Sequence, residues 1–382
     1  MMKNKLYTTL LAGLMMGAAV SAQAADDLLH IKGKLANFGD SAVVVYGPLG
    51  GKTQQTNILL KNGTFDFTLP IKEIAYLQMA TPATMRDEER TILHVVGAPG
   101  ETVELNGDMK TGYNISGSKF YQQYHEVDLL LENSTKELQE FSNAMQKRLD
   151  AGENRGQIMK EYNEKAPALE EKAQQAMLDF IRQHPSYEPS AIIISHFNDV
   201  KKMEQAIALL TAEVQNGRMK SYYSYFLDRA KRRAAKEEQA AKAQAVGVQA
   251  PDFTLTDLQG KALALSSLRG KYVVLDFWGS WCIWCVRGFP KMKEYYNKYK
   301  GQFEILGIDC GDSDEKWRAA VKKHDLPWLH VYNPKDSKVQ ADYAIQGFPT
   351  KIIVGPDGKI VKTIVGEDPE FYTILDDLFG KK

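Results

Sequence analysis

The spacing of hydrophobic and polar positions divides the chain into three parts. Between residues 26 and 117, short stretches alternate apolar and polar positions, as Phe65, Phe67 and Leu69 do, and this period of two is typical of half-buried strands. The same alternation recurs at Val43 and Val45, at Ile92, His94 and Val96, and at Val103 and Leu105. Turn-forming pairs such as Asn62-Gly63 separate these stretches. The first part is therefore predicted to be an antiparallel β-sandwich or barrel.

From residue 118 to 245 the apolar positions follow helical spacing instead. Three stripes are formed by Leu131, Leu138, Phe141, Met145 and Leu149, by Leu169, Ala173, Met177 and Phe180, and by Ile207, Leu210 and Val214. Pro185 and Pro189 divide the helices, and the charged, alanine-rich stretch 229–242 is expected to be a solvated connector. The stripes either pack within the chain or form a homodimer interface, and the sequence leaves both readings open.

From residue 246 to 382, strand and helix patterns alternate. The nearly continuous apolar runs 272–278 and 303–309 suit strands that are covered on both faces by helices. The stretch 283–299 reads as a helix, and the segments 350–354 and 360–365 read as a hairpin. Asp368-Pro369 then predicts the start of a closing helix. This part is predicted to be an α/β domain with a sheet of mixed direction.

The first 24 residues have the pattern of a secretory signal peptide. Lys3 and Lys5 precede the apolar stretch 6–20, and Ala22-Gln23-Ala24 has the small-x-small pattern of a cleavage site. We expect cleavage after Ala24 and a periplasmic protein, with an uncleaved N-terminal anchor as the alternative.

Composition narrows the classes of function. The 382 residues include 48 Lys and Arg and 48 Asp and Glu, so no bulk charge attracts nucleic acid or anionic lipid. The 3 cysteines are too few for an exported scaffold stapled by disulfides. Two of them, Cys282 and Cys285, have C-x-x-C spacing, which makes redox or metal chemistry the leading question.

The strand 272–278 leads directly into this C-x-x-C pair, and Cys282 falls where the next helix begins. Unpaired backbone N–H groups and the positive end of the helix dipole favour a thiolate there. In such motifs the pKa of the attacking thiol falls from about 8.5 to between roughly 3.5 and 7.5. We therefore expect Cys282 to attack a disulfide and Cys285, one turn further on and more shielded, to resolve the mixed disulfide.

The cysteine pair has three other possible interpretations. A zinc site needs further ligands, and the sequence has no second C-x-x-C or H-x-x-x-H pattern, so we expect no metal. Haem attachment requires a histidine after the second cysteine, where this chain has Val286. A purely structural disulfide is the remaining alternative.

These motifs occur in the order that is typical of one family. Residues 246–382 resemble a thioredoxin-fold domain of the TlpA/ResA-like group of exported thiol-disulfide oxidoreductases. The resemblance is carried by Ala250-Pro251-Asp252-Phe253-Thr254-Leu255, by the W-C-x-x-C segment 274–285 and by Gly347-Phe348-Pro349-Thr350. More weakly, residues 28–117 resemble a β-rich domain of uncharacterised function that often precedes such domains. The predicted fold is thus multidomain, with a signal peptide (1–24), a β-rich domain (26–117), a helical region with its linker (118–245) and a thioredoxin-like domain (246–382).

The resemblance implies roles for several further residues. Pro349 would face the cysteines through a cis Phe348-Pro349 bond, leaving the adjoining backbone of Phe348 and Thr350 free to bind a substrate strand; a trans turn proline is the alternative. Asp276 corresponds to the buried carboxyl group that assists proton transfer at the resolving cysteine. Its alternative is an aspartate that only forms hydrogen bonds with the neighbouring backbone.

The chain departs from the family pattern at two places. Ile283-Trp284 stands between the cysteines where relatives commonly have Gly-Pro, which puts the reduction potential and substrate preference in doubt. Gly288 occupies a position where many relatives have a glutamate, so a proton relay through that position is missing.

The remaining cysteine and the tryptophans near the motif each have two readings. Cys310 is either a third redox thiol or a small buried hydrophobic residue. Trp278 is expected in the core, whereas Trp281 and Trp284 either pack there or bind substrate.

The sequence therefore predicts a periplasmic protein-disulfide reductase or isomerase that needs no dissociable cofactor. Its expected partners are protein disulfide substrates and a thiol electron donor in the membrane or periplasm. A partner-binding protein with an auxiliary thioredoxin domain is the first alternative. A peroxide reductase is the second, although the sequence before Cys282 lacks the proline and threonine of a P-x-x-x-T/S-x-x-C motif.

Overall fold

The computed structural model describes residues 27–86 and 91–380. The predicted signal peptide therefore lies outside the described residues. Contacts divide the chain into two compact units, which are described separately below. The first unit extends to residue 151 and includes 161–228, and the second contains 152–160 and the residues from 229 onward. No helix among the described residues has the length and apolar character needed to cross a membrane.

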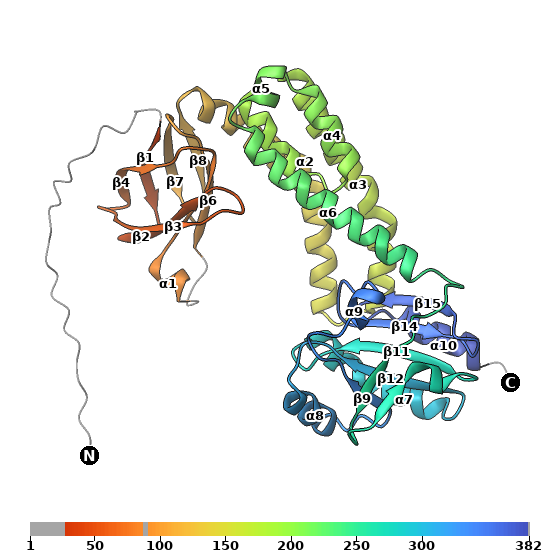
Figure 1. The fold of residues 1–382 in the computed structure, drawn as a ribbon. Helices are drawn as coiled ribbons and strands as arrows, with labels where there is room; N and C mark the ends of the chain where they lie inside the picture. The colour runs from red at the N-terminus through yellow and green to blue at the C-terminus, as the bar shows by residue number, and fades with distance from the viewer. Residues whose placement is uncertain (1–26, 87–90, 381–382) are drawn as a thin grey trace, which may run out of the picture. The chain divides into compact units, whose positions relative to one another are not determined.

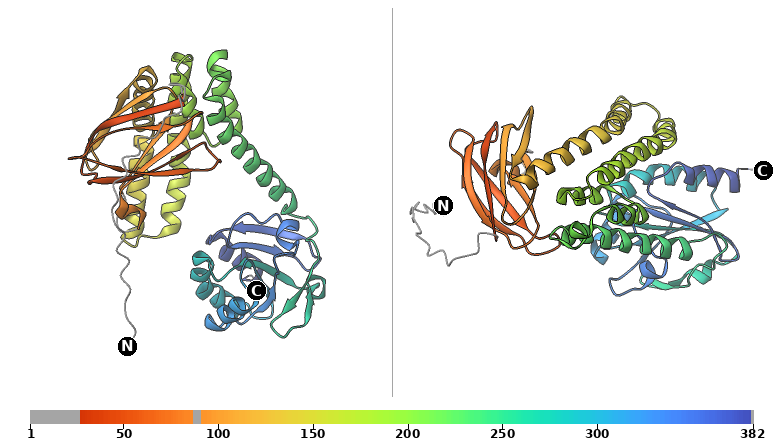
Figure 2. Two further views of the ribbon diagram at one scale, coloured as in Figure 1. Left: turned by 60° about the vertical axis from the view of Figure 1, so that its left-hand side comes forward. Right: turned by 90° about the horizontal axis from the view of Figure 1, so that it is seen from above.

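The N-terminal part of the first unit contains two four-stranded sheets (Figure 1, Figure 2). The first sheet has the order β4-β1-β7-β8 and consists of β1 (Leu28–Ala36), β4 (Thr64–Pro70), β7 (Thr102–Asp108) and β8 (Gly112–Gly117). The second has the order β3-β2-β5-β6 and consists of β2 (Ser41–Gly47), β3 (Gln54–Leu59), β5 (Ala75–Ala80) and β6 (Ile92–Gly97), with the short helix α1 (Pro82–Met85) between the last two.

The expectation of purely antiparallel pairing is wrong at one place. Strands β1 and β7 pair in parallel, with Ile31 opposite Val103, because the chain builds the second sheet between them and then returns in the original direction. Both sheets have free edge strands, so the described strands form no closed barrel. Leu29 and Leu77, one from each sheet, approach Gly97 so closely that a Cβ there would lie within 3.0 Å of both. A sandwich remains a prediction.

Helices follow the β-rich part of the chain. They are α2 (Lys119–Asp150), α3 (Arg155–Gln183), the 3₁₀ helix η2 (Glu188–His196), α4 (Val200–Leu209), α5 (Ala212–Asn216) and α6 (Lys220–Ala243). Five members of the predicted stripes are buried within the chain, namely Met145, Ala173, Met177, Leu210 and Val214. The stretch 229–242, expected to be a charged and solvated helical connector, is helical and exposed at nearly all of its positions, and it forms the second half of α6. The 3₁₀ helix η2, which no sequence pattern indicated, buries Ile192, Ile193 and Ile194.

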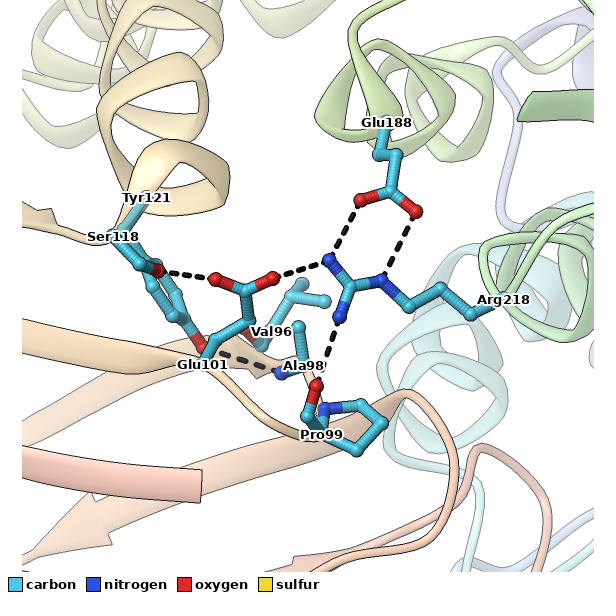
Figure 3. A network of polar contacts seen from close by, with 8 residues as sticks. All are labelled: Val96, Ala98, Pro99, Glu101, Ser118, Tyr121, Glu188 and Arg218. Carbon is cyan, nitrogen blue, oxygen red and sulfur yellow. Dashed lines mark hydrogen bonds and ion pairs between the residues drawn. The ribbon is translucent and has the colours of Figure 1, made fainter. Parts of the chain in front are cut away.

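A network of polar contacts within the first unit joins its β-rich and helical parts (Figure 3). The guanidinium group of Arg218 donates to both carboxylate oxygens of Glu188, at 3.0 and 2.6 Å, and to the carbonyl oxygen of Pro99 at 2.8 Å. It also donates to Glu101 at 2.5 Å, and Ser118 donates to the other oxygen of that carboxylate. The turn between β6 and β7 is thereby joined to the starts of α2 and η2.

The second unit contains a seven-stranded sheet of order β10-β9-β13-β12-β11-β14-β15. Its strands are β9 (Thr254–Asp257), β10 (Ala262–Ala264), β11 (Tyr272–Trp278), β12 (Phe303–Asp309), β13 (Leu329–Tyr332), β14 (Thr350–Val354) and β15 (Ile360–Val365). Its shorter helices are η3 (Leu265–Leu268), α7 (Ile283–Lys298), α8 (Asp314–Lys323), α9 (Val339–Asp342) and α10 (Glu370–Phe379). Strand β11 pairs in parallel with β12 and antiparallel with β14, which confirms the mixed sheet.

Side chains at alternating positions of the central strand β11 pack into two hydrophobic cores, one on each face of the sheet. Val273, Leu275 and Phe277 pack in one core, whereas Val274 and Trp278 pack in the other. The second core also contains residues of α7 and α10. Because side chains alternate across a strand, Asp276 lies on this second face, and the fold thereby places a carboxyl group on the side of the sheet where α7 begins.

Candidate active site

Cys282 and Cys285 form a disulfide bond at the start of α7. The two sulfur atoms are 2.09 Å apart and the Cα atoms 5.3 Å apart. Cys282 is the N-cap residue of α7, and its sulfur accepts a hydrogen bond from the backbone N–H of Cys285 at 3.1 Å. The predicted position at a helix start is confirmed. Cys285 was expected to be more shielded from solvent than Cys282, but the difference is slight: Cys282 is 5% and Cys285 3% exposed.

The loop before Cys282 is held by the segment that follows β12. Asp312 accepts hydrogen bonds from the backbone N–H of Ser280 at 2.6 Å and from its hydroxyl group at 2.7 Å. The indole N–H of Trp281 donates to the carbonyl oxygen of Cys310 at 2.9 Å. Sequence reasoning missed Asp312, because no local pattern links it to Ser280, 32 residues away. These bonds fix the direction in which the chain enters α7.

Apolar side chains are exposed around the disulfide. Trp281 is 57%, Ile283 59% and Trp284 44% exposed, and these three residues adjoin the cysteines in the sequence. The ring of Trp281 meets that of Phe348 edge to face, with centroids 5.2 Å apart. The predicted core position of Trp278 is confirmed, since it is fully buried.

The segment before β14 contains the predicted cis peptide bond between Phe348 and Pro349. The carbonyl oxygen of Pro349 accepts a hydrogen bond from the backbone N–H of Gly366 at 2.7 Å. The hydroxyl group of the buried Thr350 donates to the carbonyl oxygen of Gly347 at 2.8 Å. Thr350 is also paired on both sides, with Phe277 of β11 and with Val365 of β15.

Asp276 is buried beneath the helix that carries the cysteines. Burial raises its pKa to about 6; the ammonium group of Lys351 opposes this shift and the carboxylate of Glu367 adds to it. One of its carboxyl oxygens has no hydrogen-bond partner among the described residues. The group therefore exchanges a proton near neutral pH, as general acid–base chemistry requires.

Lys351 and Glu367 form an ion pair that the sequence analysis did not single out. The distance from Nζ to Oε2 is 2.7 Å, and the Lys351 side chain is only 1% exposed. Glu367 also accepts a hydrogen bond from the hydroxyl group of Tyr372 at 2.8 Å. The one available signal was a lysine inside an otherwise apolar strand, since the neighbours of Lys351 in β14 are all buried.

Cys310 lies at the end of β12 with its thiol group buried. Burial is the main cause that raises its pKa, and the nearby Asp309 and Asp276 add to the shift. Burial also raises the pKa of Asp309, to about 8, with a further contribution from Asp312. In this disulfide form the Cys310 thiol is thus neither ionised nor accessible, which favours the reading as a buried hydrophobic residue.

Among residues 27–86 and 91–380, no group of three His, Cys, Asp or Glu side chains is placed to hold a metal ion.

The proteins that this chain resembles match its C-terminal part. Residues 246–363 match the AhpC/TSA family. The thiol-disulfide oxidoreductase ResA of Bacillus cereus is 39% identical over 123 residues, which are 32% of this chain and 70% of that protein. ResA of Bacillus subtilis is 36% identical over 121 residues, which are 31% of this chain and 67% of that protein. Among solved structures, the thioredoxin domain of a thiol-disulfide oxidoreductase from Bacteroides vulgatus is 34% identical with a TM-score of 0.34, covering 35% of this chain and 98% of that chain.

A C-terminal thioredoxin-like domain with a cysteine pair at a helix start defines a thiol-disulfide oxidoreductase. The chain belongs to the family of the thiol-disulfide oxidoreductase ResA.

Proposed function

We propose that the protein reduces or isomerises disulfide bonds of other proteins in the periplasm. The observation that carries this proposal is the Cys282–Cys285 disulfide at the start of α7, flanked by the exposed side chains of Trp281, Ile283 and Trp284. An apolar surface beside a reactive thiol suits the hydrophobic segments of a partly unfolded protein. Trp281, Trp284 and Phe348 are the side chains we assign to substrate contact.

The reaction proceeds in two exchanges. The Cys282 thiolate attacks one sulfur of the substrate disulfide, forms a mixed disulfide and releases the other substrate sulfur as a thiolate, which takes up a proton. The Cys285 thiol then gives its proton to Asp276 and attacks Cys282. The second substrate thiolate leaves, and two electrons have passed to the substrate. Pro349 aligns the substrate backbone.

Return to the dithiol state needs two electrons and two protons. We assign them to a thiol protein of the membrane or periplasm, so that no dissociable cofactor takes part. Isomerisation differs only in that the substrate's own thiolate attacks the mixed disulfide, which leaves the enzyme reduced.

Export is the second component of the proposal. It is supported by Lys3 and Lys5, by the apolar stretch 6–20 and by Ala22-Gln23-Ala24. N-terminal sequencing of the protein recovered from the periplasm should begin at Ala25. Recovery of the intact N-terminus in the membrane fraction would show an uncleaved anchor instead.

Insulin reduction with dithiothreitol as electron source tests the activity. The wild-type protein should accelerate precipitation of the insulin B chain, and Cys282→Ser should abolish the acceleration. Cys285→Ser should accumulate a mixed disulfide with insulin, because the resolving thiol is missing. If wild-type and Cys282→Ser proteins behave alike, the partner-binding alternative is correct, and peroxide consumption that depends on Cys282 would indicate a peroxide reductase.

A further inference from the structure

Lys351 and Asp276 stand opposite each other in the sheet. They are direct register partners of the antiparallel strands β14 and β11, so their side chains leave the same face of the sheet. Lys351 is almost completely buried and is held by its ion pair with Glu367. A buried ammonium group needs such a partner, since an unpaired charge in the interior is strongly destabilising.

The Glu367 carboxylate can lie beside Lys351 because the neighbouring residue of α7, Gly288, has no side chain. A Cβ on Gly288 would lie 2.4 Å from Oε2 of Glu367, so a side chain at position 288 and the present Glu367 carboxylate exclude each other. Gly288 lies on the helix that carries Cys285, three residues after it. The Glu367 carboxylate thus occupies the space beside α7 that a side chain from α7 itself would otherwise fill.

Several elements place a group that can titrate near Asp276. Lys351 comes from β14, Glu367 from the segment after β15 and Tyr372 from α10. Strand β12 contributes Asp309, which lies on the same face two residues after Gly307, and Cys310, whose side chain belongs to the core on the other face. Burial raises the pKa of Asp309 to about 8, and α7 carries the two active-site cysteines. Burial raises the pKa of Tyr372, and Glu367 and Asp276 add to the shift. The Tyr372 hydroxyl and the Cys310 thiol therefore stay neutral near pH 7.

On the other side of Asp276, strand β12 places Gly307 opposite it. The imidazole of His330 from β13 fills the space above that glycine, where a Cβ would lie 2.6 Å from its Nδ1. Burial lowers the pKa of His330 to about 3, so this ring is uncharged. In this disulfide form, Lys351 and Glu367 are then the two charged side chains that act on Asp276.

We propose that Lys351 and Glu367 are positioning residues of the dithiol site that together set the proton affinity of Asp276 and thereby the pH at which Cys285 resolves a mixed disulfide. This inference rests on the dithiol chemistry proposed above and deepens it. Lys351 favours the carboxylate form of Asp276, whereas Glu367 opposes it and partly offsets the ammonium charge. The two residues thus shift the pKa of Asp276 in opposite directions.

Single-turnover reaction of the reduced protein with 5,5′-dithiobis(2-nitrobenzoate) separates the two thiols. In the first phase Cys282 forms a mixed disulfide and releases one thionitrobenzoate. In the second phase Cys285 loses its proton to Asp276, bonds to Cys282 and releases the second thionitrobenzoate. The pH midpoint of the second phase is the quantity to compare between variants.

Glu367→Gln should move this midpoint to lower pH, because Lys351 then acts on Asp276 without an opposing charge. Lys351→Met should move it to higher pH. Each shift should be about one pH unit or more, as for charges a few ångströms apart. The first phase should change little, whereas a general loss of structure would alter both phases. Glu370→Gln is the matched control, because Glu370 pairs with Lys362 at the surface, and it should leave both phases unchanged.

Coincident midpoints in wild type and Glu367→Gln, or shifts of the same sign in both variants, would overturn the inference. If Lys351→Met does not fold, Glu367→Gln alone decides. Failure of the proposed function is a separate result, because insulin turnover that survives Cys282→Ser says nothing about the midpoint of the second phase.

Discussion

Glu101 and Arg218 form a 2.5 Å ion pair between residues 117 positions apart in the chain. Arg218 binds Glu188 and the carbonyl oxygen of Pro99 at the same time, and its guanidinium group lies 5.2 Å from the ring centroid of Phe120. One side chain therefore connects the turn between β6 and β7, the first turn of α2 and the start of η2. Its removal would leave two carboxylates facing each other without a cation.

We expect Arg218→Met to destabilise the first unit by about 1–3 kcal/mol, less than for a fully buried pair because Arg218 is partly exposed. All five tryptophans belong to the second unit. Urea unfolding should therefore shift to lower concentration when followed by far-UV circular dichroism but not when followed by tryptophan fluorescence.

The exposed pair between Lys172 and Glu137 provides the control for this measurement. Lys172→Met should change stability by less than about 0.5 kcal/mol. An effect of Arg218→Met no larger than that of Lys172→Met would show that the network adds nothing to stability.

Because the pKa of Asp309 is raised in the folded protein, we expect the free energy of unfolding to fall as pH rises. Its folded-state pKa is about 8 against an ordinary value of 3.8, so the folded protein keeps a proton that the unfolded chain has lost. Stability is then highest below the unfolded-state pKa and is lost as pH rises through the folded-state pKa. Between pH 7 and 8, above the histidine pKa of about 6.5, the loss should be about 1 kcal/mol.

Asp309→Asn should remove this slope and be more stable than wild type at pH 8, measured by tryptophan fluorescence during urea unfolding. Asp314→Asn, which alters an exposed residue paired with Arg318, should keep the slope. An unchanged slope in Asp309→Asn would assign the pH dependence to another group.

The Cys310 thiol should react neither with alkylating reagents nor with disulfides in the oxidised protein. Its thiol is buried and its pKa is raised, so too little thiolate forms to react. Iodoacetamide should label no cysteine in the native oxidised protein and one per chain after denaturation. Cys310→Ala should retain wild-type insulin turnover, since Trp281 bonds to the backbone at this position. Loss of turnover, or a disulfide between Cys310 and either active-site cysteine, would make it a third redox thiol.

Much of the thioredoxin-like domain could be predicted from local patterns. The apolar run of β11 and the helix that follows place Cys282 at a helix start, because the positions that form a strand and its turn into a helix are neighbours in the sequence. The strands 303–309, 350–354 and 360–365 match β12, β14 and β15 for the same reason. The cis bond before Pro349 was foreseen only through the family resemblance.

Contacts between distant segments could not be predicted in this way. Periodicity tells which face of an element is buried but not which element covers it. The parallel pairing of β1 with β7 therefore went unforeseen, as did the bonds from Ser280 to Asp312.

The sequence by itself determined that a cysteine pair begins a helix after a buried strand, because that chemistry depends on adjacent residues. Only the tertiary structure decided what surrounds Asp276. The register of β14 places Lys351 beside it, and the missing side chain at Gly288 admits Glu367. The strength of a charge interaction depends on distance and burial, and both are set by folding rather than by position along the chain.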